Sequence, residues 1–166
     1  MDIKQILIVA ILLSACCEDD RIYIDRACTP TERSLIRTAA HKINAVAGFE
    51  RIEIAGLKTL KGDILNDDYN SVTCRGTNTG NEPHTGEAYG TDIILYRDYI
   101  DNNRVFLNVA MHEFIHYIAE GHEVDLDFVD SEGHIDDENC IMTEYVDTDP
   151  PLEFCEKDIE FIRSVL

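Results

Sequence analysis

A helical segment in the second half of the chain most constrains what this sequence can fold into. Apolar residues recur at helical spacing between Val105 and Ile118, among them Val109, Ala110 and Phe114. Asn102 or Asn103 supplies an N-cap, and Gly121 is a natural stop. The pattern predicts one long helix that ends near Gly121.

Three polar residues interrupt this segment at the spacing of a metal site. His112 and His116 are four residues apart, so their imidazoles project from one face of the helix and can share a zinc ion. Glu113 follows His112 directly and can reach a water molecule beside that ion, where a general base is needed. We therefore expect His112 and His116 as ligands of a single Zn²⁺ and Glu113 as the catalytic base.

The third ligand is open to more than one choice. His122 stands six residues after His116, and Gly121 gives the chain the freedom to double back toward the metal. The alternatives are His134 or a carboxylate. His134 requires the acidic segment to fold over the site, and the nearby carboxylates would raise the pKa of the reacting water. We expect His122.

The N-terminus is typical of an exported protein. Residues 1–15 contain a charged start, a short apolar run and small residues, which together predict a signal peptide. The run is too short to span a bilayer. Residues 13–16, Leu-Ser-Ala-Cys, resemble the bacterial lipobox, in which the cysteine carries a lipid. We expect lipidation of Cys16 and a place in the bacterial cell envelope, with an ordinary secretory signal as the alternative.

Residues 16–166 have a length that suits a single domain. The charge of the chain limits the binding partners that it can have. The chain has 33 acidic and 14 basic residues and a formal net charge of -19. Nucleic acid is therefore excluded as a partner, and contact with a membrane is expected only through the lipid anchor. We read the acidity as a solvated surface, and we expect a monomer that acts on a protein or peptide substrate.

The cysteines of an exported protein are expected to form disulfides. With Cys16 lipidated, five remain, and four of them allow three pairings. We expect one disulfide between Cys28 and Cys74 and another between Cys140 and Cys155. Cys17 would then stay unpaired in the short segment that follows the lipidated Cys16.

The rest of the chain predicts an alternation of strands and helices. We expect strands over residues 21–25, 50–55 and 91–96, and helices from Thr29 to Gly48 and after Pro150-Pro151. Residues 62–90 read mostly as loop, and residues 123–139 as an acidic, irregular segment. Calcium could bind that segment, but its acidic residues lack the spacing of a calcium loop, so we prefer a solvated loop.

The zinc pattern resembles that of the metzincin metallopeptidases. Their motif H-E-x-x-H-x-x-G-x-x-H matches at His112, Glu113, His116 and His122, whereas Ala119 stands where the family has glycine. The resemblance implies two further residues. Met142 would form the turn beneath the metal, and Tyr145 is a possible oxyanion stabiliser, although it stands three places after the methionine and not two.

The resemblance also implies a fold and an activity. It predicts a zincin-like α+β fold with a small mixed sheet on two long helices, the zinc site in the second helix, then the Met turn and a C-terminal helix. A short matrixin-like bacterial peptidase is the nearest branch. The implied function is a zinc-dependent endopeptidase whose substrate lies along an edge strand, for which residues 91–96 are the candidate. The alternatives are a non-catalytic, zinc-stabilised binding lipoprotein and a zinc peptidase with another third ligand.

Overall fold

A computed structural model describes residues 21–59, 70–77, 85–122, 124, 126–144 and 149–166. These residues form an α+β fold with a five-stranded mixed sheet and three α-helices. No helix within them is both long and apolar enough to cross a membrane. The expected signal peptide, Cys16, Cys17 and Tyr145 lie outside the described residues.

The sheet has four parallel strands and one antiparallel edge strand. Its strands run in the order β2-β1-β3-β5-β4. Strand β1 pairs in parallel with β2 and β3, β3 pairs in parallel with β5, and β4 is antiparallel to β5. The bounds are Arg21–Asp25 for β1, Glu53–Lys58 for β2, Asn70–Arg75 for β3, Gly86–Tyr89 for β4 and Asp92–Tyr96 for β5.

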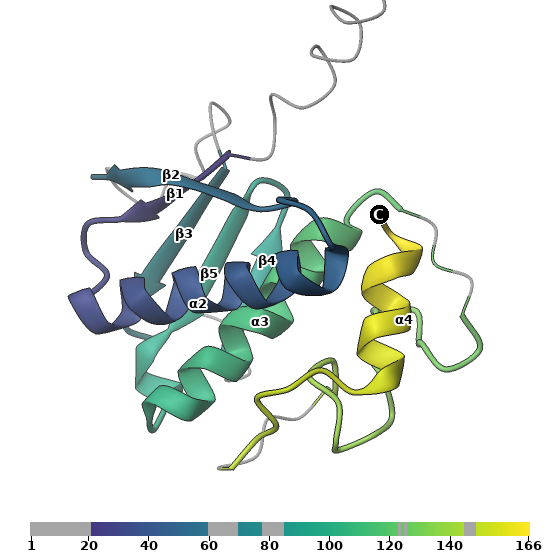
Figure 1. Cartoon of the computed structure of the whole chain (residues 1–166). Coiled ribbons are helices and arrows are strands. Elements are labelled where there is room, and N and C mark those ends of the chain that lie inside the picture. The colour runs from purple at the N-terminus through teal and green to yellow at the C-terminus, as the bar shows by residue number, and fades with distance from the viewer. Residues whose placement is uncertain (1–20, 60–69, 78–84, 123, 125, 145–148) are drawn as a thin grey trace, which may run out of the picture.

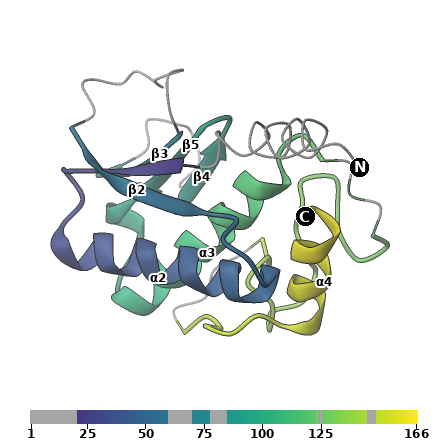
Figure 2. The same ribbon diagram turned by 45° about the horizontal axis from the view of Figure 1, so that its top comes forward.

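Helix α2, Pro30–Ala47, forms where its capping residues predict it. The Thr29 side chain accepts the N–H of Glu32, the Glu32 side chain accepts the N–H of Thr29, and Gly48 ends the helix. Its apolar stripe packs toward the sheet, beside α3 (Figures 1 and 2). The buried residues of that stripe are Ile36, Ala39, Ala40 and Ile43.

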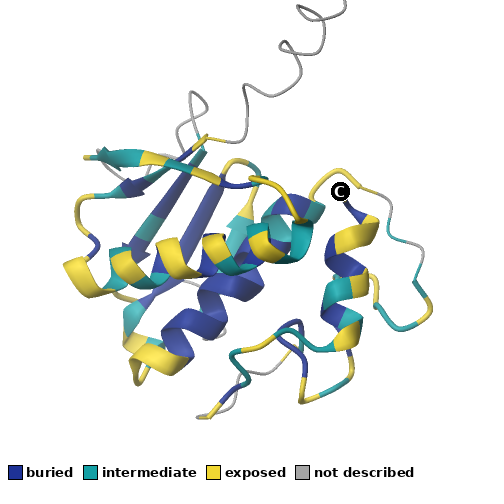
Figure 3. Cartoon of the chain, viewed as in Figure 1, coloured by how far each residue is buried: buried dark blue, intermediate teal, exposed yellow. Residues whose placement is uncertain are grey.

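Helix α3, Asn103–Ala119, is the central element of the molecule. The Asn102 side chain caps it by accepting the N–H groups of Arg104 and Val105 at 2.8 and 3.0 Å. The helix is buried along most of its length (Figure 3), because it lies between α2, the sheet and α4. Side chains on α3 are therefore held by packing from several sides, which is the setting a precise site needs.

Helix α4, Glu156–Ser164, begins later than Pro150-Pro151 led us to expect. Its N-cap is Cys155, and its buried side chains include Phe161 and Ile162. It packs against α2 and α3 at one end of the molecule (Figure 1). A 3-10 turn, η1 (Arg97–Tyr99), follows β5.

Three strand predictions need correction. The strand expected over 50–55 is β2 and begins three residues later, at Glu53. Residues 62–90, expected to be mostly loop, contain β3 and β4. Residues 91–96 do form a strand, β5, but it lies inside the sheet, and β4 takes the edge beside it. The physical reason is that β4 folds back on β5 as a hairpin through Gly90 and so covers the edge.

Candidate metal centre

Two histidines of α3 face each other across a very short gap. The Nε2 atoms of His112 and His116 are 2.9 Å apart, and their ring centroids are separated by 4.6 Å. The Nδ1 of His112 lies 2.9 Å from the carbonyl oxygen of Ile141. A carbonyl only accepts, so Nδ1 carries the proton and the lone pair of Nε2 points toward His116.

Both imidazoles are neutral at pH 7. Burial lowers the pKa of His112 to about 4, against the opposing effect of its hydrogen bond to Ile141. Burial also lowers the pKa of His116 to about 3, with further lowering by His112 and His134. A metal ligand must be a neutral imidazole, so these two rings need lose no proton before they bind a cation.

His134 is the third histidine that the structure brings to this pair. Its ring centroid lies 5.3 Å from that of His112 and 5.0 Å from that of His116. One ligand atom from each of the three rings falls within 4.8 Å of the others. The Asp130 carboxylate orders the loop, because its Oδ1 accepts the N–H groups of Glu132 and His134, each at 2.8 Å.

His122, the ligand expected from the sequence, does not join this group. The chain leaves α3 in a tight turn in which the N–H of His122 donates to the carbonyl of Ala119 at 3.0 Å and Gly121 has a φ of 77°. This turn leaves His122 exposed on the wall of the cleft. Among the described residues, His134 and not His122 joins the histidine pair. This geometry does not support the expected role of His122, and which histidine binds a metal stays a prediction.

Carboxylates do lie close to His134, as the sequence led us to expect. Asp130 and Glu132 do lie close to its ring, with carboxylate oxygens 3.8 and 3.9 Å from Nδ1. They approach the ring of His134 itself, whereas the expectation from the sequence placed such carboxylates beside the reacting water.

Glu113 lies against the edge strand β4. Burial and the nearby charge of Glu87 raise its pKa to about 8, and a hydrogen bond from the N–H of Ala88 partly offsets this. Gly86 makes the close approach possible, because a Cβ there would lie 2.7 Å from Oε1 of Glu113 and 2.9 Å from Cγ1 of Val109. Strand β4 therefore fixes the carboxylate beside the three histidines.

A cleft of about 910 Å³ opens over these residues. Its walls come from β4, from α3, from the loop that carries His134 and from Glu144. The three histidines and Glu113 all line this cleft, and one of its walls is the edge strand β4 of the sheet.

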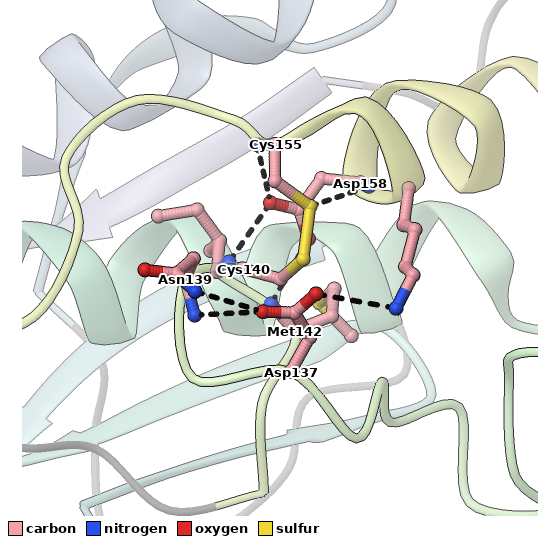
Figure 4. A network of polar contacts seen from close by, with 8 residues as sticks. Asp137, Asn139, Cys140, Met142, Cys155 and Asp158 are labelled. Atoms are coloured by element: carbon pink, nitrogen blue, oxygen red, sulfur yellow. Dashed lines mark hydrogen bonds and ion pairs between the residues drawn. A yellow bond between two sulfur atoms is a disulfide. The ribbon is translucent and has the colours of Figure 1, made fainter.

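A buried turn behind His112 contains Met142, whose side chain is fully buried (Figure 4). The buried carboxylate of Asp158 accepts the N–H of Ile141 at 2.8 Å through Oδ2 and that of Met142 at 3.1 Å through Oδ1. It also accepts the N–H of Cys155 at 3.0 Å. A turn is thus present at Met142 and is anchored to α4. Its expected place beneath a metal stays a prediction.

Both expected disulfides form. Cys28 is bonded to Cys74 and Cys140 to Cys155, and the second bond lies beside Met142 in Figure 4. The cysteine-containing groups that could otherwise take a metal involve these bonded sulfurs, so among the described residues the histidine group is the one with free ligand atoms. The expected roles of Cys16 and Tyr145 fall on residues outside those described.

The donors fit a zinc ion. They are three imidazoles, two of them neutral at pH 7, and three protein ligands with an open position are typical of catalytic zinc. The Nδ1 of His134 is buried without a hydrogen-bond partner, and the short Nε2 to Nε2 distance brings two nitrogen atoms together. A shared cation would satisfy both features.

Oxygen donors for calcium are less well arranged. Asp130 and Asp137, in the segment considered for calcium, already accept backbone N–H groups, and Asp137 also pairs with Lys157 at 3.2 Å. We find no arrangement of carboxylates among the described residues that resembles a calcium loop.

Sequence reasoning missed Gly86, Glu87 and Asp158. A lone glycine in a polar stretch and a lone aspartate near the start of a helix carry no pattern that marks them. Their contribution comes from contacts between distant segments.

The fold and site define an α+β protein with a three-histidine cluster and an adjoining buried glutamate. In comparisons with known proteins, no family model matches the chain and no curated protein matches its sequence.

Proposed function

We propose that this protein is a zinc-dependent endopeptidase in which His112, His116 and His134 hold the metal and Glu113 is the catalytic base. The observation that carries the proposal is the position of Glu113, buried beside three convergent histidines in an open cleft. A purely structural zinc site needs no such carboxylate and is usually closed by a fourth protein ligand.

The chain's own residues account for the handling of protons and substrate. Glu113 takes a proton from the attacking water and then passes it to the leaving amine. The edge strand β4 offers backbone groups to an extended peptide, which would add to the sheet as a further strand. Zinc would supply an acidified water and a polarised carbonyl, and its positive charge would lower the pKa of Glu113.

We keep the relation to metzincins as part of this proposal, but only for the first two histidines, the element order and Met142. The element order, the histidine pair on the second long helix and the buried Met142 agree with that resemblance. The third histidine follows His116 by eighteen residues and not by six, so the long zinc motif is not used as the family uses it. A zinc peptidase of another branch with the same first two ligands is the alternative.

The ligand assignment is tested by metal affinity. His134→Ala should weaken zinc binding by at least about a hundredfold, because a three-ligand site loses one ligand. His122→Ala is the matched control, from the same cleft, and should leave affinity unchanged. The reverse result would restore His122 as the ligand and contradict the geometry on which the proposal rests.

The activity is tested on purified residues 17–166 loaded with one equivalent of zinc. Hydrolysis of a peptide library, lost on chelation and regained with zinc, would support the proposal. Stoichiometric zinc without any hydrolysis would favour the binding-lipoprotein alternative.

The location is a further part of the proposal. Residues 1–16 support export and lipid attachment at Cys16. Mass spectrometry of membrane-extracted protein should find a lipid on that cysteine. A soluble, unmodified chain that begins after Ala15 would show an ordinary secretory signal.

A further inference from the structure

The described residues that line the cleft include many acidic side chains and no lysine or arginine. Apart from Glu113, five carboxylates are among them. The five come from β4, the end of α3, the histidine loop and the segment after Met142: Glu87, Glu120, Asp130, Glu132 and Glu144. Their formal charge of -5 exceeds the charge of a bound divalent cation.

Some acidic residues outside the cleft are paired with a basic side chain. Outside the cleft, Glu32, Asp137 and Glu153 are each within 3.2 Å of an arginine or lysine nitrogen. Within the described part of the chain, no cleft carboxylate has such a partner. Glu132 remains 76% exposed even though it lies near His134.

Two of the five accept hydrogen bonds, but neither has a lysine or arginine partner among the described residues. Glu87 accepts the hydroxyl of Tyr96 at 3.1 Å, and Asp130 accepts backbone N–H groups. Glu120 and Glu144 are exposed. A cationic group that enters the cleft would therefore meet carboxylates that no arginine or lysine of the described chain neutralises.

An exposed aromatic ring in the cleft would also favour a cationic ligand. Tyr89 at the end of β4 lines the cleft and is 71% exposed, which makes it the most exposed large apolar residue among those described. A lysine or arginine side chain can stack on such a ring and gain about 0.5–1 kcal/mol at an exposed site.

We infer that the preferred substrates are cationic peptides, with lysine or arginine next to the bond that is cut. This inference rests on the proposed function, since it names the substrate class of the same site. Composition alone predicted only a solvated acidic surface, whereas the cleft gathers carboxylates that have no lysine or arginine partner among the described residues. Such a field raises the local concentration of cationic ligands and weakens as salt screens it.

The test compares three peptides of equal length that differ only in the residues flanking the scissile bond: lysine, glutamine or glutamate. With the zinc-loaded protein at low salt, kcat/KM should fall in that order and should be at least about tenfold higher for the lysine peptide than for the glutamate peptide. The preference should shrink at high salt, on the order of 0.5 M NaCl.

Two double variants separate the cleft from the overall charge. Glu120→Gln with Glu144→Gln removes two cleft charges, and Glu50→Gln with Glu160→Gln removes two exposed charges outside it. We expect the first pair to reduce the lysine-to-glutamine ratio of kcat/KM at least about threefold and the second to leave it unchanged. Equal rates for all three peptides, or an equal loss from both pairs, would overturn the inference.

A binding measurement keeps this inference separate from the proposed function. Fluorescence anisotropy reports the affinity of zinc-loaded Glu113→Gln protein for each peptide without turnover. Tighter binding of the lysine peptide, with no hydrolysis by the wild type, would support the charge preference and contradict the peptidase. Hydrolysis of all three peptides without any charge preference would support the peptidase and contradict the charge preference.

Discussion

Asp158 and His112 are linked through the main chain of a single residue, Ile141. The N–H of Ile141 donates to Asp158 at 2.8 Å, and its carbonyl accepts from the ring of His112 at 2.9 Å. The carboxylate is fully buried, and burial raises its pKa. A residue on α4 thus fixes the main chain that orients one ring of the candidate metal centre on α3.

Asp158→Asn should weaken zinc binding by about 10- to 100-fold, because an amide cannot accept hydrogen bonds through both of its terminal atoms. The visible spectrum of the cobalt-substituted protein should change with it, which a loss of stability alone would not produce. The exposed Glu160→Gln, on the same helix, is the control. An unaltered cobalt spectrum in the folded Asp158→Asn protein would limit Asp158 to a structural role.

Gly86→Ala should lower kcat by about tenfold or more while zinc stays bound. The added Cβ would stand 2.7 Å from Oε1 of Glu113, so the carboxylate must move, and small displacements of a reacting group are costly. Gly76→Ala is the matched control, since its Cβ meets nothing closer than 3.4 Å. Steady-state kinetics and zinc content should separate the two variants, and equal kcat values would remove the role given to Gly86.

Glu113→Gln should retain zinc but lose about 10²- to 10⁴-fold in kcat, because the change removes the base and no ligand. The measurement is hydrolysis of the best peptide at matched zinc content. A variant with more than about a tenth of the wild-type rate would rule out the base assignment.

Removing either disulfide should lower the free energy of unfolding, but only one of the two removals should also lower the affinity for zinc. In the chain-entropy account, replacing Cys140 and Cys155 by serine costs about 3 kcal/mol, and replacing Cys28 and Cys74 costs about 4 kcal/mol because the loop is longer. Only the first pair borders Met142, so only its loss should weaken zinc binding. Urea unfolding and zinc titration check both effects. Equal affinities in the two variants would uncouple the disulfide from the metal centre.

Glu32→Gln should destabilise the fold by about 1.5–3 kcal/mol at pH 7 and by less in acid. Burial raises the pKa of Glu32, but hydrogen bonds from Arg97 and Thr29 outweigh it and bring the pKa below 4.5. A lowered folded pKa contributes stability above the unfolded pKa, and this stability is lost as pH falls through the folded value.

The glutamine that replaces Glu32 could still cap α2, so the variant isolates the contact with Arg97, whose Nε lies 2.6 Å from Oε1. Denaturant unfolding between neutral pH and about pH 3 measures the trend. Glu53→Gln, which breaks an exposed pair at 4.0 Å, should have almost no effect. A constant difference between wild type and Glu32→Gln over this range would contradict the pKa shift.

Local signals explain what the sequence could predict. Helix α2 has a capping box and a glycine stop, and α3 has a capping asparagine, so the sequence places both to within a few residues. Strand β3 escapes prediction because most of its residues are polar, Ser71 included although it is buried, and only Val72 and Cys74 are apolar. Parallel pairing with β1 and β5 makes it a strand, and that pairing is not local.

The candidate site also combines residues that local spacing predicts with a residue that depends on contacts between distant segments. His112, Glu113 and His116 belong to one helix, and their spacing alone predicts that they lie together. The third histidine depends on how an irregular segment returns to the helix, which follows from the Asp130 turn and the bridge between Val129 and Ile135. Spacing favours the nearer His122, and the path of the loop favours His134.

The anchoring of Ile141 has a consequence for how the protein matures. His112, His116 and Glu113 precede Asp158 in the chain, so the main chain of Ile141, which contacts the ring of His112, is anchored only after the chain has been made as far as Asp158 and α4 has docked. The Cys140–Cys155 bond that borders this turn forms in an oxidising compartment. For the exported zinc peptidase that we propose, the metal centre would therefore be completed late, after export, and the newly made chain would bind zinc poorly inside the cell.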